Sequence, residues 1–334
     1  MITVVGMGTK AGDVSQRGAE AIRNAKKVVV KTGLTATYAF FGDIEHITLD
    51  HLYESAGTFT ELDELIAREV MSFGDCVYCV DGSGADDGSV RKLAESAEIN
   101  IIPGVSLGAE GLCRVPSLSY SSYSASDYDQ TLPLVRRFPT VFTEIDSRIA
   151  AGELKLTLMD KMGEEEDVLF YDGEAWKAIP LYELDRQQDY CYYTKCVIPE
   201  RGLEKDRYDF SDLLQIMNRL RAPDGCPWDR AQTHESIKKC LIEESGELCD
   251  AIDNNDVDNM CEESGDVLLQ AVFHAKIGED TGEYTVNEMI SGLCQKLISR
   301  HTHIFGDVVA NSPEEALVAW QNAKKLEKER KAKR

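Results

Sequence analysis

The sequence has no excess of basic residues and no long apolar run. It carries 36 Lys and Arg against 59 Asp and Glu, a formal net charge of −23 over 334 residues. Non-specific nucleic-acid binding depends on basic patches, so this balance argues against a nucleic-acid partner. No stretch reaches the roughly 18 apolar residues of a membrane span, and the chain does not open with the charged-then-apolar pattern of a signal peptide. We therefore expect a protein without a membrane span that works in the cytoplasm.

Cysteine pairs at zinc-binding spacing are also scarce. The ten cysteines are scattered, and the one C-x-x-C, Cys76 and Cys79, lies in the apolar run CVYCV. In a strand these two side chains point to opposite faces, so they would not share a metal ion. No second Cys or His pair at zinc spacing accompanies them. Reduced thiols packed in a core are the favoured interpretation.

What the sequence does contain is a set of carboxylates on apolar helix faces, between Ile237 and Asp266. Two helices are predicted there, on either side of an Asn/Asp turn near 253–258. In the first helix, apolar residues recur every three or four positions, and Glu244 stands where another is expected. In the second helix, Glu263 interrupts the apolar face in the same way. Residues three apart share a helix face, and two such pairs result: Glu244 with Glu247, and Glu263 with Asp266.

Four carboxylates at or beside a core face call for a cation. Burying an unpaired carboxylate costs several kcal/mol or shifts its pKa strongly. Because every candidate ligand is an oxygen, Mg²⁺ or Mn²⁺ is the expected ion, and Mg²⁺ held in this way usually meets substrate phosphates. The alternative is that these Glu-rich helices are simply solvated. The register argues against it, since exposed charges should avoid the apolar face.

The same residues resemble the metal motif of the MazG-type nucleoside triphosphate pyrophosphohydrolases. That motif is EE-x-x-E followed by E-x-x-D, and here it stands as EESGE at 243–247 and ESGD at 263–266. The resemblance extends over about 210–325. Further matching blocks are CPWD and QTH within 226–234, FHA at 273–275, and KLISRHTHIFG at 296–306.

The resemblance implies Mg²⁺-dependent hydrolysis of nucleoside triphosphates to nucleoside monophosphate and pyrophosphate. Glu243 and Glu262 stand next to the implied ligands, where each could orient a metal-bound water or act as general base. Solvent-facing roles for these two are an equal alternative. The implied metal ligands are Glu244, Glu247, Glu263 and Asp266.

Three cations and one aromatic residue are candidates for substrate contacts. Arg300 suits bidentate phosphate binding, and Lys296 and Lys324 would act as point charges; their alternative is ordinary surface charge. Trp228, in a Pro-flanked loop, could stack on a base or pack against the helical core. A hairpin of two acid-lined helices offers only a small core, and the resemblance implies that helices of two chains complete the bundle. We therefore expect a homodimer.

The first 199 residues alternate apolar strands with helices, which predicts an α/β domain with a mostly parallel sheet. A Gly173 turn predicts a hairpin. Residues 117–129, with Tyr/Ser alternation and no helical period, are predicted to be loop. Strands are expected at 2–5, 28–30, 76–80, 99–102, 140–143, 155–158, 168–171 and 177–180, with a closing edge strand at 191–197.

This half resembles the tetrapyrrole (corrin/porphyrin) methylase fold, in the variant fused to a MazG domain. The residues that carry the resemblance include TVVGMG at 3–8 and IPGVS at 102–106. That family holds S-adenosylmethionine against its Gly-rich turns, because glycine permits close approach. The first turn here, GMGTKAGD at 6–13, has two extra residues, and the second, DGSGADD at 81–87, carries three Asp. The implied cofactor contacts are Gly6, Gly8, Asp81, Gly82, Pro103, Gly104 and Ser106.

The sequence thus predicts two domains: an α/β methylase-like domain over 1–199 and an all-α MazG-like domain over 209–334, joined by a charged linker over 200–208. Nucleoside triphosphates are the expected substrates. Two alternatives stay open. One is an S-adenosylmethionine-dependent methyltransferase with an accessory MazG domain. The other is a non-enzymatic sensor of nucleotide or S-adenosylmethionine.

Overall fold

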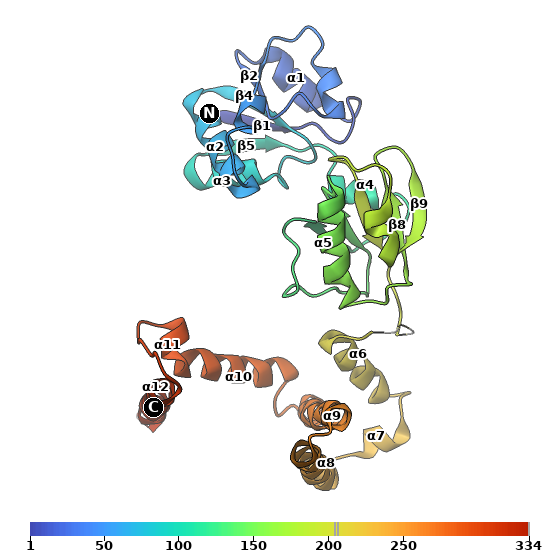
Figure 1. The fold of residues 1–334 in the computed structure, drawn as a ribbon, viewed down its shortest axis with the longest axis vertical. Helices are drawn as coiled ribbons and strands as arrows, with labels where there is room; N and C mark the ends of the chain where they lie inside the picture. Colours follow the sequence, from blue (N-terminus) through green and yellow to red (C-terminus); the bar gives the residue numbers. More distant parts are fainter. Residues whose placement is uncertain (204, 206, 333–334) are drawn as a thin grey trace. The chain divides into compact units, whose positions relative to one another are not determined.

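The computed structural model describes residues 1–203, 205 and 207–332, and the chain separates into two compact units (Figure 1). The first unit spans Met1–Asp209 and the second Phe210–Arg334. Residues 204 and 206 of the predicted linker, and 333–334 of the predicted second domain, lie outside the described residues. The linker boundaries stay a prediction.

The first unit opens with a five-stranded parallel sheet in the order β3-β2-β4-β1-β5. Helices cover both of its faces: α2 and α3 pack with one buried cluster around Tyr78, and α1 packs with another around Val5. Buried strands between two helical layers explain why the strand sequences are continuously apolar. The elements are β1 (Ile2–Gly6), α1 (Gln16–Asn24), β2 (Val28–Val30), β3 (Ile47–Thr48), α2 (Phe59–Ser72), β4 (Cys76–Val80), α3 (Gly88–Ser96) and β5 (Ile99–Ile102).

A second, mixed sheet completes this unit, in the order β6-β7-β10-β8-β9. Strands β6 and β7 are parallel, and the other pairs are antiparallel. The predicted hairpin around Gly173 is confirmed as β8 and β9. The elements are α4 (Leu107–Gly111), β6 (Ser121–Ser124), β7 (Thr140–Thr143), α5 (Arg148–Met159), β8 (Asp167–Tyr171), β9 (Trp176–Pro180) and β10 (Lys195–Ile198).

Three local predictions in this region were wrong. The expected strand at 155–158 lies within helix α5, which Ser147 caps and which buries Ala151, Leu154 and Leu158 at helical spacing. The expected loop at 117–129 contains strand β6, whose polar sequence pairs in parallel with the buried strand β7. The expected edge strand at 191–197 begins later, and β10 lies in the middle of the sheet between β7 and β8.

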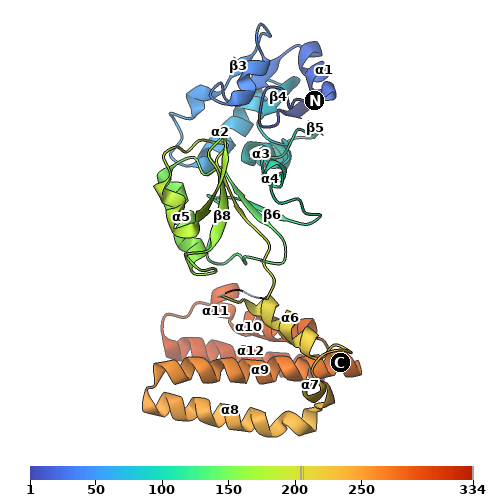
Figure 2. The ribbon, with the colours of Figure 1, turned by 90° about the vertical axis from the view of Figure 1, so that its right-hand side faces the viewer.

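The second unit is helical in its described residues. Its longest feature is a hairpin of α8 and α9 (Figure 2). Thr233 opens α8 with a capping box, Asn255 ends it in the left-handed region at φ 54°, and Asp256 caps α9. The helices are α6 (Phe210–Leu220), α7 (Pro227–Ala231), α8 (His234–Asn254), α9 (Val257–Thr281), α10 (Val286–Arg300), α11 (Thr302–Phe305) and α12 (Pro313–Ala332).

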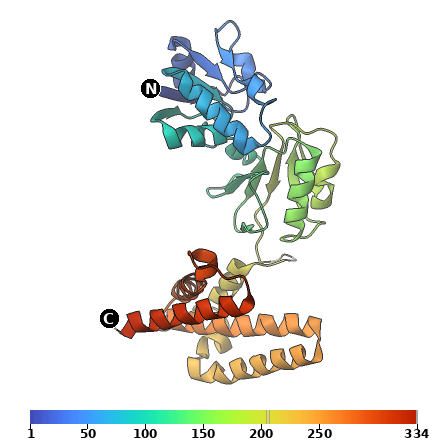
Figure 3. The ribbon, with the colours of Figure 1, turned by 60° about the vertical axis from the view of Figure 1, so that its left-hand side comes forward.

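Helix α10 leads away from this hairpin. In Figure 1, α9 is seen end-on and α10 runs across the view towards α11 and α12. Helix α12 packs on α10 and α11, and Figure 3 shows it running along the same direction as α9. The predicted fold class, an α/β domain followed by an all-α domain, is confirmed. Among the described residues, no helix combines the length and apolarity that crossing a membrane requires.

Candidate metal centre and the N-terminal turns

The α8–α9 hairpin brings three of the four predicted metal ligands together. Glu244 on α8 and Glu263 and Asp266 on α9 each offer a carboxylate oxygen, and these oxygens lie within 4.8 Å of one another. Glu263 is 8% exposed, and its Oε2 atom is buried without a hydrogen-bond partner. Glu247 is exposed and does not belong to this group of three. The helical period therefore predicted the region of the cluster, and the packing of the two helices determines which three carboxylates lie close together.

The cluster carries unbalanced negative charge. Removal from water raises the pKa of Glu263, and the neighbouring carboxylates of Glu247, Asp266, Glu244 and Glu262 raise it further. Removal from water also raises the pKa of Glu244, followed by repulsion from Asp266, Glu247 and Glu243. Glu247 thus raises the pKa of both Glu244 and Glu263, although it lies outside the group of three.

These donors fit a hard divalent cation. All three are carboxylate oxygens, the ligand type that Mg²⁺ and Mn²⁺ prefer. The partnerless Oε2 atom of Glu263 is a buried acceptor that a cation would satisfy. The predicted proton-transfer residues Glu243 and Glu262 are exposed, each adjacent in sequence to a central carboxylate. Their position is compatible with contact to a metal-bound water as well as with a solvated face.

The predicted phosphate contacts gather on another part of the helical unit. Arg300, at the end of α10, forms an ion pair with Glu327 at 3.0 Å, and its guanidinium lies 5.4 Å from the Trp320 ring centroid. Lys324 lies 4.8 Å from the same ring centroid, and Lys296 is exposed on α10. The 15 residues of α10 extend about 21 Å at the usual rise. Within one chain, the helix therefore carries Arg300 away from the α8–α9 hairpin.

The blocks CPWD, QTH and FHA meet at the open end of the α8–α9 hairpin, away from its turn at Asn255 and Asp256. Trp228 is 60% exposed, and its ring is tilted against buried Phe273 at a centroid distance of 6.5 Å. His234 and His274 stack with parallel rings 5.0 Å apart and share a 2.7 Å hydrogen bond between their Nδ1 atoms. Burial lowers the pKa of His274, and the adjacent His234 lowers it further. Sequence reasoning missed this pair because the two histidines are 40 residues apart and belong to separate sequence blocks.

The predicted S-adenosylmethionine contacts also come together, at the carboxyl ends of β1, β4 and β5. Their backbone groups, however, bind one another. Gly8 and Gly82 exchange two backbone hydrogen bonds of 3.0 and 2.8 Å, and the Gly104 amide donates to the Ser83 carbonyl at 3.2 Å. A Cβ atom on Gly6 would lie 2.4 Å from that same carbonyl oxygen. The glycines thus permit the close approach of loops to loops.

The polar side chains among these contacts are engaged as well. Asp81 is buried and accepts hydrogen bonds from Thr37 Oγ1 at 2.5 Å and from the Tyr193 hydroxyl at 3.0 Å. Ser106 caps α4 through its hydroxyl, and Pro103 has no amide to donate. The predicted set of turn residues therefore does not fit S-adenosylmethionine as a free backbone cradle.

Comparisons with known proteins give matches to the whole chain and to parts of it. The family model described as MazG nucleotide pyrophosphohydrolase domain matches residues 232–305. YabN of Bacillus subtilis is 33% identical over 349 residues, covering 98% of this chain and 71% of that protein. The Thermotoga maritima nucleoside triphosphate pyrophosphohydrolase/pyrophosphatase MazG is 51% identical over 122 residues, covering 36% of this chain and 46% of that protein. The crystal structure of a precorrin-6Y methylase from Archaeoglobus fulgidus is similar at 20% identity and a TM-score of 0.46, covering 60% of this chain and 98% of that one.

Proposed function

This chain belongs to the family of Bacillus subtilis YabN and carries a MazG domain in its helical unit, and on that basis we propose that it hydrolyses nucleoside triphosphates to nucleoside monophosphate and pyrophosphate with Mg²⁺ or Mn²⁺. The observation that carries the proposal is the meeting of Glu244, Glu263 and Asp266 within 4.8 Å. The Thermotoga relative, whose name states this activity, supports it over the helical unit.

The reaction requires water to attack the α-phosphorus while the bond to the β-phosphate oxygen breaks. A bound divalent ion would lower the pKa of that water and offset charge on the phosphate oxygens. Glu244, Glu263 and Asp266 would hold the ion, with Glu247 adding negative charge beside them. Glu243 or Glu262 would accept the proton of the attacking water. The two products together then contain all the atoms of the triphosphate and the water.

We also propose that the active form is a homodimer. Apolar side chains on four helices are exposed in the single chain: Ile242 67%, Ile252 53%, Leu268 44%, Leu293 50%, Leu297 46%, Ile298 53%, Leu317 55% and Val318 56%. A second copy would cover such surfaces, and a two-fold axis is the commonest arrangement. It would also allow Lys296, Arg300 and Lys324 of one copy to face the carboxylates of the other.

A cytoplasmic location is part of the proposal. The ten cysteines are free, and Cys76, Cys79 and Cys196 are buried. Free buried thiols are typical of proteins in a reducing compartment.

A panel of ribo- and deoxyribonucleoside triphosphates with Mg²⁺ tests the activity. The full-length protein should release equal amounts of monophosphate and pyrophosphate, measured by anion-exchange chromatography. Release of diphosphate and inorganic phosphate would instead show cleavage at the terminal bond and contradict the proposal. Binding of a triphosphate without turnover would favour the sensing alternative, and methyl transfer would require a separate assay with S-adenosylmethionine.

A further inference from the structure

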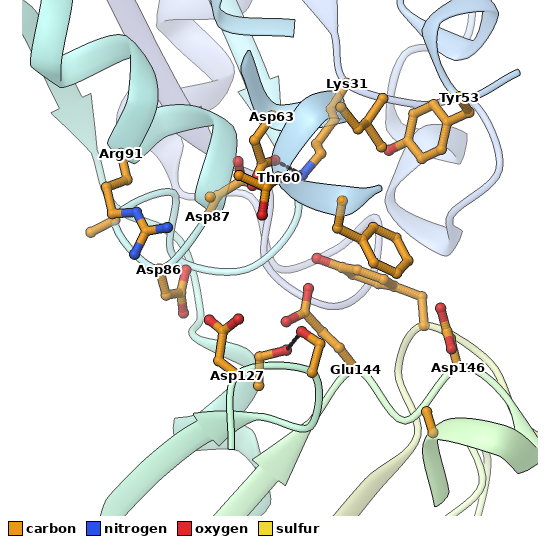
Figure 4. A pocket seen from close by; sticks show the side chains of 18 residues that line it. Lys31, Tyr53, Thr60, Asp63, Asp86, Asp87, Arg91, Asp127, Glu144 and Asp146 are labelled. Atoms are coloured by element: carbon orange, nitrogen blue, oxygen red, sulfur yellow. Dashed lines mark hydrogen bonds and ion pairs between the residues drawn. The ribbon is translucent and has the colours of Figure 1, made fainter. Parts of the chain in front are cut away.

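The first unit contains a cavity that the proposed hydrolysis does not use. Its volume is about 640 Å³, within the range of cavities that hold a small organic molecule. Figure 4 shows it from close by: side chains reach it from α2, from the β4–α3 turn and α3, and from the segments that follow β6 and β7. The walls thus come from both sheets of the unit.

The lining is strongly acidic. Six carboxylates face two cations, Lys31 and Arg91. Lys31 is already neutralised, because its Nζ atom lies 2.7 Å from Asp87 and 3.9 Å from Asp63. Asp86 accepts hydrogen bonds from the amide and hydroxyl of Ser83. An anionic ligand, such as a tetrapyrrole with several carboxylates, would meet net repulsion here.

Three further carboxylates of the lining form no ion pair within the described part of the chain: Asp127, Glu144 and Asp146. Figure 4 shows all three around the cavity, opposite Lys31. Glu144 is the most enclosed of them. Burial raises its pKa, and the hydrogen bond from Ser124, the Lys31 charge and the hydrogen bond from Tyr192 oppose that rise only in part. Its backbone φ is 59°, a conformation that a non-glycine residue adopts at a cost.

The acidic groups are spread around the cavity, not gathered as for a metal ion. Among the described residues, one group of three or more His, Cys, Asp or Glu side chains is close enough to share an ion, and it is the group in the helical unit. The cavity walls also include aromatic rings from Tyr53, Phe59 and Tyr192. Aromatic faces together with carboxylates attract ammonium and sulfonium groups on an organic body.

We propose that this cavity binds an organic cation. Its positive group lies among Asp127, Glu144 and Asp146, and its carbon skeleton contacts the aromatic walls. The ammonium group of an amine is the positive group that these carboxylates and aromatic rings recognise. The inference does not depend on the hydrolysis proposed for the helical unit.

Isothermal titration calorimetry on the full-length protein at physiological salt tests it. The probes are spermidine and choline, with the uncharged analogue of choline in which carbon replaces the nitrogen as the neutral control, and uroporphyrin as the polycarboxylate. We expect at least one cation to bind with one-to-one stoichiometry. The double variant Glu144→Gln/Asp146→Asn should weaken it at least tenfold, while uroporphyrin does not bind.

A protein of net charge −23 attracts cations over its whole surface, so a charge-matched control is needed. Glu164→Gln/Glu165→Gln removes the same charge from a loop of the same unit that does not line the cavity. Equal weakening in both double variants would overturn the proposal, as would the absence of binding by both amines at millimolar concentration. Equal affinity for choline and its uncharged carbon analogue would show that charge is not what the cavity recognises, and would overturn the proposal too.

Discussion

Replacing Asp266 by Asn should separate the two effects of the carboxylate cluster, the repulsion without metal and the attraction for metal. Asp266 lies within 4.8 Å of Glu244 and Glu263 and raises the pKa of both. The substitution keeps the size of the side chain and removes one charge. Without metal, we therefore expect the helical unit of Asp266→Asn to be at least as stable as that of the unaltered protein.

The expected metal effect follows from mass action. A cation at a hundredfold excess over its dissociation constant stabilises the folded state by about 2.7 kcal/mol. The helical unit, Phe210–Arg334, has about 125 residues, so its unfolding entropy is about 0.26 kcal/mol/K and its melting temperature should rise by about 10 °C. If loss of the Asp266 charge weakens the cation about a hundredfold, the remaining gain is about 0.4 kcal/mol, or about 2 °C.

Differential scanning calorimetry with and without Mg²⁺ measures both quantities, with pyrophosphate release as the activity readout. Asp250→Asn is the matched control, because it removes one charge from an exposed position on α8 outside the cluster. The control should keep the full metal shift and the activity. A metal shift in Asp266→Asn equal to that of the control would refute the metal assignment, and so would full activity of Asp266→Asn.

Three further predictions test other parts of the molecule. Sedimentation velocity at micromolar concentration should give a dimer of the 37.2 kDa chain, and Leu297→Asp on the exposed face of α10 should shift it to monomer while Leu34→Asp in the first unit does not. A chain cut within 200–208 should yield a C-terminal fragment that is helical by circular dichroism and still releases pyrophosphate, because few contacts cross domain boundaries; an inactive but folded fragment would show that the first unit is required. Burial raises the pKa of Asp87, but the Lys31 charge and the hydrogen bonds from Lys31, Ser89 and Val90 outweigh that effect and hold the pKa below 3.8. The contribution of the Asp87 carboxylate to the free energy of unfolding is therefore present above pH 3.8 and is lost as the pH falls through the lowered pKa. The Asp87→Asn variant should melt at a lower temperature than the unaltered protein at pH 7, and it should lose less stability than the unaltered protein between pH 4 and pH 2.

The helical unit was more predictable from sequence than the first unit for a physical reason. A helix repeats every 3.6 residues, so spacing alone places Glu244, Glu263 and Asp266 on faces that can meet. Spacing does not say which side chains come close together, and Glu247 does not belong to the group of three. The strand expected at 155–158 failed because four residues are too few to distinguish periods, whereas Ala151, Leu154 and Leu158 together show the helix.

The role of the glycines in the first unit could not be predicted from the sequence. A glycine-rich turn after a strand signals that something approaches the backbone closely, but the sequence does not say what. Here Gly6 makes room for the Ser83 carbonyl, so the approaching group is another loop of the same chain. The acidic cavity had no signal in the sequence, because Lys31, Asp127 and Glu144 come from separate segments and no motif joins them. These side chains surround one cavity only after both sheets have formed. The class of ligand proposed for this unit therefore rests on the folded arrangement, and not on the glycine-rich turns that suggested a cofactor in the sequence.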